Sequence, residues 1–394
     1  MGSASHFPEF PRWPIYSKVE ISAVTRVLES GLGNYWHGSE GKTFEREFAS
    51  YCGVRHGLAV ANGTVALELC LRALGIGPGD EVVTTPRSFI ATANSIVLCG
   101  ARPVFADVDP DSQNITPESV TAVLTADTRA ILAVHLSGWP CDVAGLQQLA
   151  AEKELYLIED CAQAHGACVD GVKVGAWGHA AAFSFCHDKI ISTGGEGGML
   201  VSDDEELRAK AAAFRNHGRD PRNQPGDKHE YPYLHGTVGS NYRMTEMQSA
   251  IGRIQLTRLE AWLEERHRNA ALLREALHDF DLLRIPTPAK NLRHAYYRLY
   301  VFLDREKLRP DWSRARIIDT LQAAGIPCDI GICPEIYREP AYRGMLTMEH
   351  ARLPCARELG ETAIAFPVHP GIGAELIRTM GRSIRALLNP ALQI

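Results

Sequence analysis

Three groups of polar residues, each placed directly after a short apolar run, could carry chemistry. Asn62-Gly63-Thr64 follows the first run, where the unpaired backbone N–H groups of a starting helix would suit a phosphate. Asp160 follows a later run, with Gln163 close behind it. A carboxylate there could bind a metal, orient a base or hold a protonated heterocyclic nitrogen. Lys189 precedes a glycine-rich turn at 193–198, and a lysine desolvated by such a turn has a lowered pKa and a nucleophilic amine.

Each group also has a plainer structural interpretation. Thr64 could simply cap a helix, Asp160 could do the same, and a lone lysine before a turn is usually exposed. The combination is more informative than its parts. A phosphate cup, a carboxylate and a lysine together provide what pyridoxal 5′-phosphate (PLP) requires, because the cup anchors the phosphate, the carboxylate keeps the ring nitrogen protonated and the lysine bonds to the aldehyde.

A sheet must position these residues. Short runs rich in Val, Ile, Leu, Ala and Phe, with little polar alternation, predict seven strands that are covered on both faces, at 57–61, 81–84, 103–106, 130–135, 155–159, 181–185 and 198–202. Most gaps hold helix signals, for example 64–74, 88–99 and 142–152. The alternation predicts an α/β fold with a doubly wound, mostly parallel seven-stranded sheet. Ligands bind beyond the carboxyl ends of such strands, where the three polar groups lie.

Helix signals and a change in the sequence pattern predict the domain organisation. Capping boxes at Ser17 and Thr245 begin helices on either side of the alternating block, and prolines punctuate the chain after about Arg266. We therefore predict an N-terminal extension at 1–16, a large PLP-binding α/β domain at 17–265 and a smaller α+β domain at 266–394. The stretch 219–236 is rich in Pro, Gly and charge, which predicts a long functional or mobile loop.

Composition excludes several classes of protein. The chain has 394 residues, 45% of them hydrophobic and 22% charged, as in globular proteins, and a formal net charge of −6 that argues against nucleic-acid binding. The longest apolar stretches are far shorter than the roughly 20 residues of a membrane span, and residues 1–14 lack the pattern of a secretory signal. Ten cysteines without CxxC pairs are too few for a disulfide scaffold, so we expect reduced thiols in a cytoplasmic protein without membrane contact.

Six motifs in consistent order resemble the DegT/StrS family of PLP-dependent sugar aminotransferases, which have the fold-type-I architecture of aspartate aminotransferase. The resemblance runs from about Ser17 to about Leu263 and continues weakly beyond. The motifs are Asn62-Gly63-Thr64, Gly77-Pro78-Gly79-Asp80-Glu81-Val82, the run 159–167, the segment from Phe183-Ser184-Phe185 to Lys189, Gly195-Glu196-Gly197-Gly198 and Asn241-Tyr242-Arg243-Met244.

The resemblance implies catalytic and phosphate-binding roles. Lys189 would bond to the cofactor aldehyde and move a proton, and Asp160 would pair with the pyridinium. Gly63, Thr64 and Ser184 would bind the phosphate.

Further contacts are implied in the same way. Phe89 would lie on the ring face, although ordinary core packing is its plainer interpretation, and Gln163 would contact the hydroxyl side of the ring. In the family an asparagine of the neighbouring subunit reaches the phosphate, and Asn241 matches it. The resemblance therefore implies a homodimer with shared active sites.

Substrate and metal residues are harder to assign from the sequence. Members of the family contact the substrate at the positions that correspond to Tyr35, Trp36 and His294. His187, two residues before the lysine, would form part of the site wall. The trio Cys161, His165 and Cys168 fits no common zinc spacing, so we predict no metal site.

The reaction that the resemblance implies is ping-pong transfer of an amino group to a keto-sugar, with L-glutamate as donor. The sugar would be a nucleotide-linked 4-keto-6-deoxyhexose or a related unusual keto-sugar such as an 8-oxo-octulosonate, because the segment 331–337 departs from the family's tyrosine–proline–histidine pattern. Two alternatives remain: a PLP-dependent sugar dehydratase or deoxygenase, in which histidine replaces the lysine, and a non-catalytic PLP-binding regulator.

Overall fold

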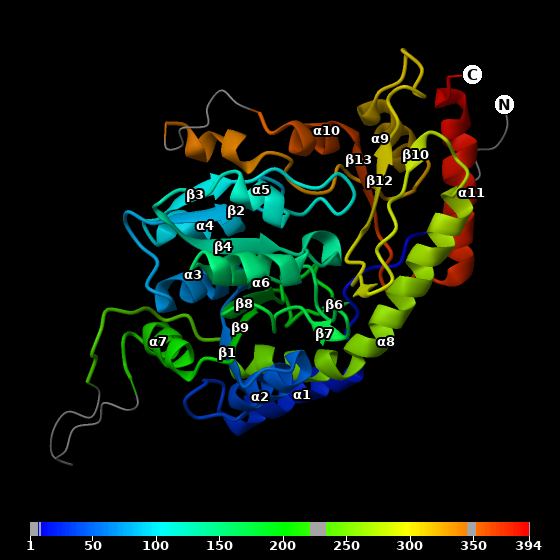
Figure 1. Cartoon of the computed structure of the whole chain (residues 1–394). Helices are drawn as coiled ribbons and strands as arrows, with labels where there is room; N and C mark the ends of the chain where they lie inside the picture. Colours follow the sequence, from blue (N-terminus) through cyan, green and yellow to red (C-terminus); the bar gives the residue numbers. More distant parts are fainter. Residues whose placement is uncertain (1–6, 8, 221–233, 345–351, 394) are drawn as a thin grey trace.

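A seven-stranded sheet forms the centre of the chain (Figure 1). The computed structural model describes residue 7 and residues 9–220, 234–344 and 352–393. From one edge to the other, the strands are β1 (His56–Val60), β9 (Gly198–Ser202), β8 (Ala180–Ser184), β5 (Tyr156–Asp160), β4 (Thr128–Val134), β2 (Glu81–Thr84) and β3 (Arg102–Phe105). Strands β8, β5, β4, β2 and β3 pair in parallel, and β9 is antiparallel to both of its neighbours. The predicted fold class is confirmed, and the seven predicted runs are these seven strands.

Helices cover both faces of the sheet, as the apolar strands predicted. Alternate strand residues point to opposite faces, so Val82 and Leu132 join the apolar cluster under α3 (Gly63–Ala73) and α7 (Glu205–Arg215). Val83 and Ile131 join the cluster under α6 (Val143–Glu152). The remaining helices around the sheet are α1 (Lys18–Ser30), α2 (Glu40–Cys52), α4 (Ala91–Leu98) and α5 (Pro117–Thr121).

One long helix, α8 (Glu246–Leu277), connects the sheet to the C-terminal part of the chain. It begins at the predicted capping box, where Thr245 accepts from the backbone of Gln248, and it contacts α1 and α2 near one end and α11 (Ala374–Leu388) near the other (Figure 1). The predicted boundary at 265/266 therefore falls inside a continuous helix.

The C-terminal part has a small antiparallel sheet of its own, made of β10 (Leu283–Arg284), β12 (Leu299–Leu303) and β13 (Ala363–Phe366). With α9 (Arg314–Ala323), α11 and the end of α8, these strands enclose a separate apolar cluster. This cluster supports the α+β domain at 266–394, which remains a prediction. The other elements are a three-stranded sheet of β11 (Leu292–Arg293), β6 (Cys168–Val169) and β7 (Val172–Lys173), and the helix α10 (Pro354–Thr362).

Two predictions concern segments rather than elements. Most of the predicted long loop at 219–236, namely residues 221–233, lies outside the described residues. Within the ranges that the structure does describe, no helix is both long and apolar enough to cross a membrane.

Candidate functional site

Five of the predicted cofactor residues come from the same edge of the large sheet, the edge formed by the carboxyl ends of the parallel strands. Asp160 is the last residue of β5, and Ser184 is the last residue of β8. Lys189 lies in the connection from β8 to β9, and Phe89 lies between β2 and α4. Gly63 begins α3 directly after β1. The topology thus gathers side chains that are far apart in the sequence.

The start of α3 forms a narrow cradle against the end of β8. The cap of this helix is Asn62, whose side chain accepts from the Val65 N–H at 3.0 Å, so the interpretation of Thr64 as the cap is wrong. A Cβ atom on Gly63 would lie 2.7 Å from the Ser184 Cβ, so only glycine permits this approach. Unpaired helix N–H groups and the Ser184 hydroxyl therefore lie side by side, an arrangement that fits a phosphate.

Asp160 is a buried carboxylate without a cationic partner. The residue is only 4% exposed, and its carboxylate accepts hydrogen bonds from the Thr92 hydroxyl at 2.9 Å and from the Ala162 N–H at 3.1 Å. It caps no helix, contrary to its plainer interpretation. Burial raises the pKa of Asp160, and the two hydrogen bonds offset this only in part. No ion pair to Asp160 exists among the residues with described positions, so a pyridinium N–H would supply the missing partner.

Lys189 lies in a small ionic cluster. Its Nζ is 3.2 Å from the Asp188 carboxylate and 5.0 Å from the centroid of the Tyr297 ring, and the Tyr297 hydroxyl donates to Asp188. Burial alone would lower the pKa of Lys189, but Tyr297 and Asp188 outweigh burial and raise the pKa. The predicted lowering of this pKa is therefore wrong for the structure described here. The physical reason is that a carboxylate, and not only a glycine-rich turn, faces the amine.

The other cofactor candidates lie in different environments. Phe89 is 63% exposed, so its interpretation as a core residue is wrong and its ring face is open to a ligand. Gln163 is buried, and its side-chain oxygen accepts from the Ser137 N–H at 2.8 Å. Asn241 is exposed in a backbone bridge with Asn216. The cofactor roles of these residues remain predictions.

The structure does not bring the four substrate candidates together around Lys189. The Tyr35 hydroxyl donates to Glu45 at 2.8 Å beneath Arg215, and burial raises the pKa of Tyr35 to about 12. Trp36 lies under the guanidinium groups of two arginines, and His187 is exposed.

His294 is held by contacts with Tyr296. Its ring stacks on Tyr296 at 4.1 Å, its Nδ1 accepts from the Tyr296 N–H at 2.7 Å, and burial holds its pKa well below the ordinary value. The backbone then turns at Tyr296, whose φ is +47°, and presents Tyr297 to Asp188. Sequence reasoning missed Asp188 and Tyr297. Both stand in motifs already singled out, but no sequence signal shows which member of each motif faces the lysine.

One group of potential metal ligands occurs in the described part of the chain, and it differs from the trio weighed in the sequence. His135, Glu159 and Cys161 have ligand atoms within 4.8 Å of one another. The His135 Nε2 lies 3.0 Å from Glu159, which also accepts from three backbone N–H groups, those of Gly175, Trp177 and Gly178. Hydrogen bonds thus account for the cluster without an ion. His165 instead packs among the rings of Phe48, Phe183 and Phe185.

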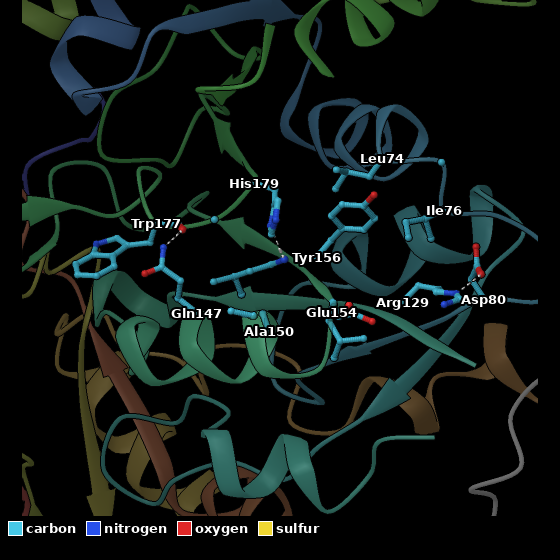
Figure 2. A pocket seen from close by; sticks show the side chains of 15 residues that line it. Leu74, Ile76, Asp80, Arg129, Gln147, Ala150, Glu154, Tyr156, Trp177 and His179 are labelled. Atoms are coloured by element: carbon cyan, nitrogen blue, oxygen red, sulfur yellow. Dashed lines mark hydrogen bonds and ion pairs between the residues drawn. The ribbon is translucent and has the colours of Figure 1, made fainter. Parts of the chain in front are cut away.

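Two clefts lie near opposite ends of the sheet. One cleft, of about 780 Å³, lies at the amino ends of the strands, where Tyr156 begins β5 and Arg129 lies 3.6 Å from Asp80. Figure 2 shows the side chains that line it. A second cleft of about 610 Å³ is lined by Asp188 and Tyr297, which contact Lys189. Volume alone would favour the first cleft, but the predicted chemistry borders the second.

Comparisons with known proteins agree with this arrangement. The family model described as "DegT/DnrJ/EryC1/StrS aminotransferase family" matches residues 14–385. A GDP-perosamine synthase of Caulobacter vibrioides is 38% identical over 350 residues, which are 88% of this chain and 90% of that protein. A UDP-N-acetyl-3-dehydro-alpha-D-glucosamine 3-aminotransferase of Acidithiobacillus ferrooxidans is 36% identical, with 94% of each chain covered.

A solved structure is similar over almost its whole length. The X-ray structure of an aminotransferase from Psychrobacter cryohalolentis superposes with a TM-score of 0.94 at 44% identity, covering 97% of this chain and 99% of that one. Together with the family match, these findings confirm the resemblance seen in the sequence.

Proposed function

The chain belongs to the DegT/DnrJ/EryC1/StrS aminotransferase family, and we propose that it moves an amino group from L-glutamate to a keto-sugar by a ping-pong mechanism. It is a sugar aminotransferase, and aminotransferases of this family use PLP. The observation that carries the proposal for this chain is the buried Asp160 carboxylate. No cation among the described residues forms an ion pair with it, and it shares the carboxyl-end edge of the sheet with Lys189 and the glycine cradle.

The residues at this edge fit the cofactor. When bound, PLP supplies an aldehyde and a protonated pyridine ring that withdraws electrons from the reacting carbon. Asp160 would hold the proton on the ring nitrogen. Gly63, Thr64 and Ser184 would bind the phosphate, and Lys189 would hold the aldehyde end.

Lys189 is also the group that moves protons. In each half-reaction its amine would take a proton from one carbon and return it to another, a contribution typically worth about 10²–10⁴-fold in rate. Asp188 and Tyr297 would hold this amine in place while it is not bonded to the cofactor. The exposed ring of Phe89 would lie on the cofactor ring, with Gln163 on the hydroxyl side.

The acceptor is a keto-sugar. The names of the relatives support a nucleotide-linked sugar, such as a 4-keto-6-deoxyhexose, and the departure at 331–337 supports an unusual sugar, such as an 8-oxo-octulosonate. An intact lysine at 189 favours amine transfer over dehydration.

We further propose a homodimer in which Asn241 reaches the phosphate of the neighbouring subunit. The exposed apolar side chains of Val19, Ile21 and Leu28 on α1 support a partner surface. Ten free cysteines support a cytoplasmic location.

The variant Lys189→Ala tests the proposed reaction. The loaded protein should lose the absorbance of the lysine–cofactor linkage and all formation of 2-oxoglutarate from L-glutamate, because no other amine is positioned there. Lys210→Ala, which changes an exposed lysine on α7, is the matched control and should retain both. Turnover by Lys189→Ala would contradict the assignment. A wild-type protein that binds PLP but aminates no keto-sugar would favour a regulatory role instead.

Subunit mixing tests the shared site. Asn241→Ala and Lys189→Ala should each be inactive alone, since one lacks the proposed phosphate contact and the other the amine. Mixed dimers would contain one intact site and regain activity. No recovery in mixed dimers isolated through a different affinity tag on each variant would contradict sharing through Asn241.

A further inference from the structure

We propose that the cleft beside Lys189 binds a keto-sugar acid, and that Arg266 anchors the single carboxylate of that sugar. The inference rests on the proposed amine transfer and names the class of sugar. The cleft has a volume of about 610 Å³ and reaches from Asp188 and Tyr297, at the lysine, to Trp13, Arg266 and Arg298.

A count of charges around this cleft leaves one positive charge unmatched. Lys189 is paired with Asp188 at 3.2 Å, and Arg298 is paired with Asp329 at 2.6 Å. His369 also lines the cleft, but burial lowers its pKa to about 4, so its ring is neutral at pH 7. Arg266 is the cation without a carboxylate.

Arg266 lies deep in the wall, with 1% of the residue exposed. Its Nη1 donates to the carbonyl oxygens of Tyr296 at 3.0 Å and Tyr297 at 3.2 Å, while its Nε has no partner. The Trp13 ring covers the guanidinium at 5.0 Å. In the part of the chain that the structure describes, no acid forms an ion pair with it.

This environment indicates an anionic ligand. Burial lowers the pKa of Arg266 to about 9, so the side chain remains charged at neutral pH. A buried charge without a counter-charge is unfavourable, and a bound carboxylate would remove that cost. The planar guanidinium fork also matches the geometry of a carboxylate.

Three aromatic rings in the wall suit a sugar ring. Phe10, Trp13 and Tyr297 line the cleft, and the apolar C–H face of a sugar can lie on such rings while its hydroxyls reach polar groups. The Trp13 indole N–H donates to the Lys189 carbonyl at 2.8 Å, which ties this wall to the reacting lysine. Phe10 and Trp13 precede residue 14, where the family match begins, so the family match does not cover these two residues of the wall.

The charge count also separates sugar acids from nucleotide-linked sugars. A nucleoside diphosphate brings two or more negative charges, and the cleft offers one unmatched cation beside two carboxylates. A second anionic group would find no unpaired cation among the described residues that this subunit contributes to the cleft. A ligand with a single carboxylate therefore fits better.

Calorimetric titration of the pyridoxamine form of the holoenzyme tests the inference without turnover. The probes are methyl β-D-glucopyranosiduronate and methyl β-D-glucopyranoside, which differ only in carrying a carboxylate or a hydroxymethyl group, and UDP-glucose. The glucuronide should bind about tenfold or more tightly than the neutral glycoside, as expected for a charge-assisted contact. Equal affinity for the two glycosides, or tighter binding of UDP-glucose, overturns the proposal. A failure of amine transfer would show only in turnover assays, so the two proposals fail separately.

Variants then locate the anchor. Arg266→Gln should abolish the preference for the glucuronide, whereas Arg268→Gln, which changes an exposed arginine two residues along α8, should keep it. Where Arg266→Gln does not fold, Arg266→Lys and the wild-type probe comparison carry the test. An unchanged preference in either Arg266 variant overturns the anchor.

The amino donor also carries a carboxylate, and a second arm of the experiment separates the two sources. The L-glutamate concentration that half-converts the pyridoxal form, followed by absorbance, should be the same in wild type and Arg266→Gln. If this concentration rises as much as glucuronide binding weakens, the anchor serves the donor and the sugar-acid assignment is overturned.

Discussion

The two ends of the large sheet differ in how their charges are satisfied. At the amino ends, around the cleft of Figure 2, Asp80 pairs with Arg129 at 3.6 Å and Gln147 donates to the Trp177 carbonyl at 2.6 Å. At the carboxyl ends, Asp160 has no cation and Arg266 has no carboxylate among the described residues. The larger hollow thus lies beside a paired aspartate and arginine, although the buried Trp177 indole N–H there has no partner among the described residues. The predicted chemistry lies where the buried charged groups Asp160 and Arg266 are unpaired.

We therefore use buried charged groups without partners, and not cleft volume, to select the candidate site. An exposed ion pair such as Asp80–Arg129 contributes about 1 kcal/mol or less and asks for no ligand. A buried carboxylate without a cation is unfavourable until a ligand supplies one. Paired substitutions at the two ends can break or sharpen this comparison.

The largest difference is expected between Asp160→Asn and Asp80→Asn. The first removes the carboxylate that would pair with the cofactor ring, and losing one partner of a buried ion pair costs about 3–5 kcal/mol, or roughly 10²-fold or more in turnover. The apo protein should not lose stability, because Asp160→Asn removes a buried charge whose pKa is raised by burial. Steady-state rates and urea unfolding of the apo form check both parts. Equal activity of the two variants would contradict the comparison.

A smaller difference is expected between two glycines. Gly63→Ala places a Cβ 2.7 Å from the Ser184 Cβ, whereas Gly77→Ala at the other end meets nothing closer than a carbonyl oxygen at 3.8 Å. Overpacking costs about 1–3 kcal/mol, so PLP affinity should fall roughly five- to a hundredfold in Gly63→Ala and stay unchanged in Gly77→Ala. Fluorescence titration of the apo proteins with PLP measures both values. Full affinity in Gly63→Ala would remove the cradle from the site.

The smallest effect is expected from Asp188→Asn, because Asp188 is about half exposed and solvent screens its pair with Lys189. Burial lowers the pKa of Lys189, whereas Tyr297 and Asp188 raise it, and the net direction is upward. Without the carboxylate the free amine should lose its proton at lower pH. The rate of the acceptor half-reaction, which increases with pH as this amine loses its proton, should therefore increase at lower pH in the variant. The maximal rate should change by less than about tenfold.

The same pair predicts a window for stability. A raised pKa at Lys189 gives stability that is present below the unfolded lysine value of about 10.4 and is lost as pH rises through the folded pKa. A lowered pKa at Asp188 gives stability that is lost as pH falls below about 3.9. The free energy of unfolding of Asp188→Asn should therefore differ from that of wild type between these limits. As a control for the rate measurement, Asp203→Asn, which changes an exposed ion pair, should show no shift in the pH–rate profile. A shift to higher pH in Asp188→Asn would contradict the assigned pairing.

Sequence reasoning was strongest where local chemistry decides the outcome. The seven strands could be predicted because strands covered on both faces are apolar at every position, as in Ala180–Ser184. The capping boxes at Ser17 and Thr245 begin α1 and α8 because side-chain capping involves residues only three positions apart.

Sequence reasoning was weakest where long-range contacts decide. His294 and Tyr297 are three residues apart and equally polar, yet the turn at Tyr296 buries the first and brings the second to Asp188. The boundary predicted at 265/266 lies within α8, whose helix continues across it, and the division into domains stays a prediction.

By itself the sequence determined the order of strands and helices, the family and the residues that belong at the carboxyl ends, since these depend on residue type and spacing. Only the tertiary structure decided the charge states and partners of those residues. The carboxylate that faces Lys189 belongs to the neighbouring residue, Asp188, but the Tyr297 side chain that contacts both comes from more than a hundred residues away. Whether Arg266 is matched by a carboxylate depends likewise on the packing that buries it. Electrostatic energy depends on distance and on the exclusion of water, and neither is set until the chain has folded.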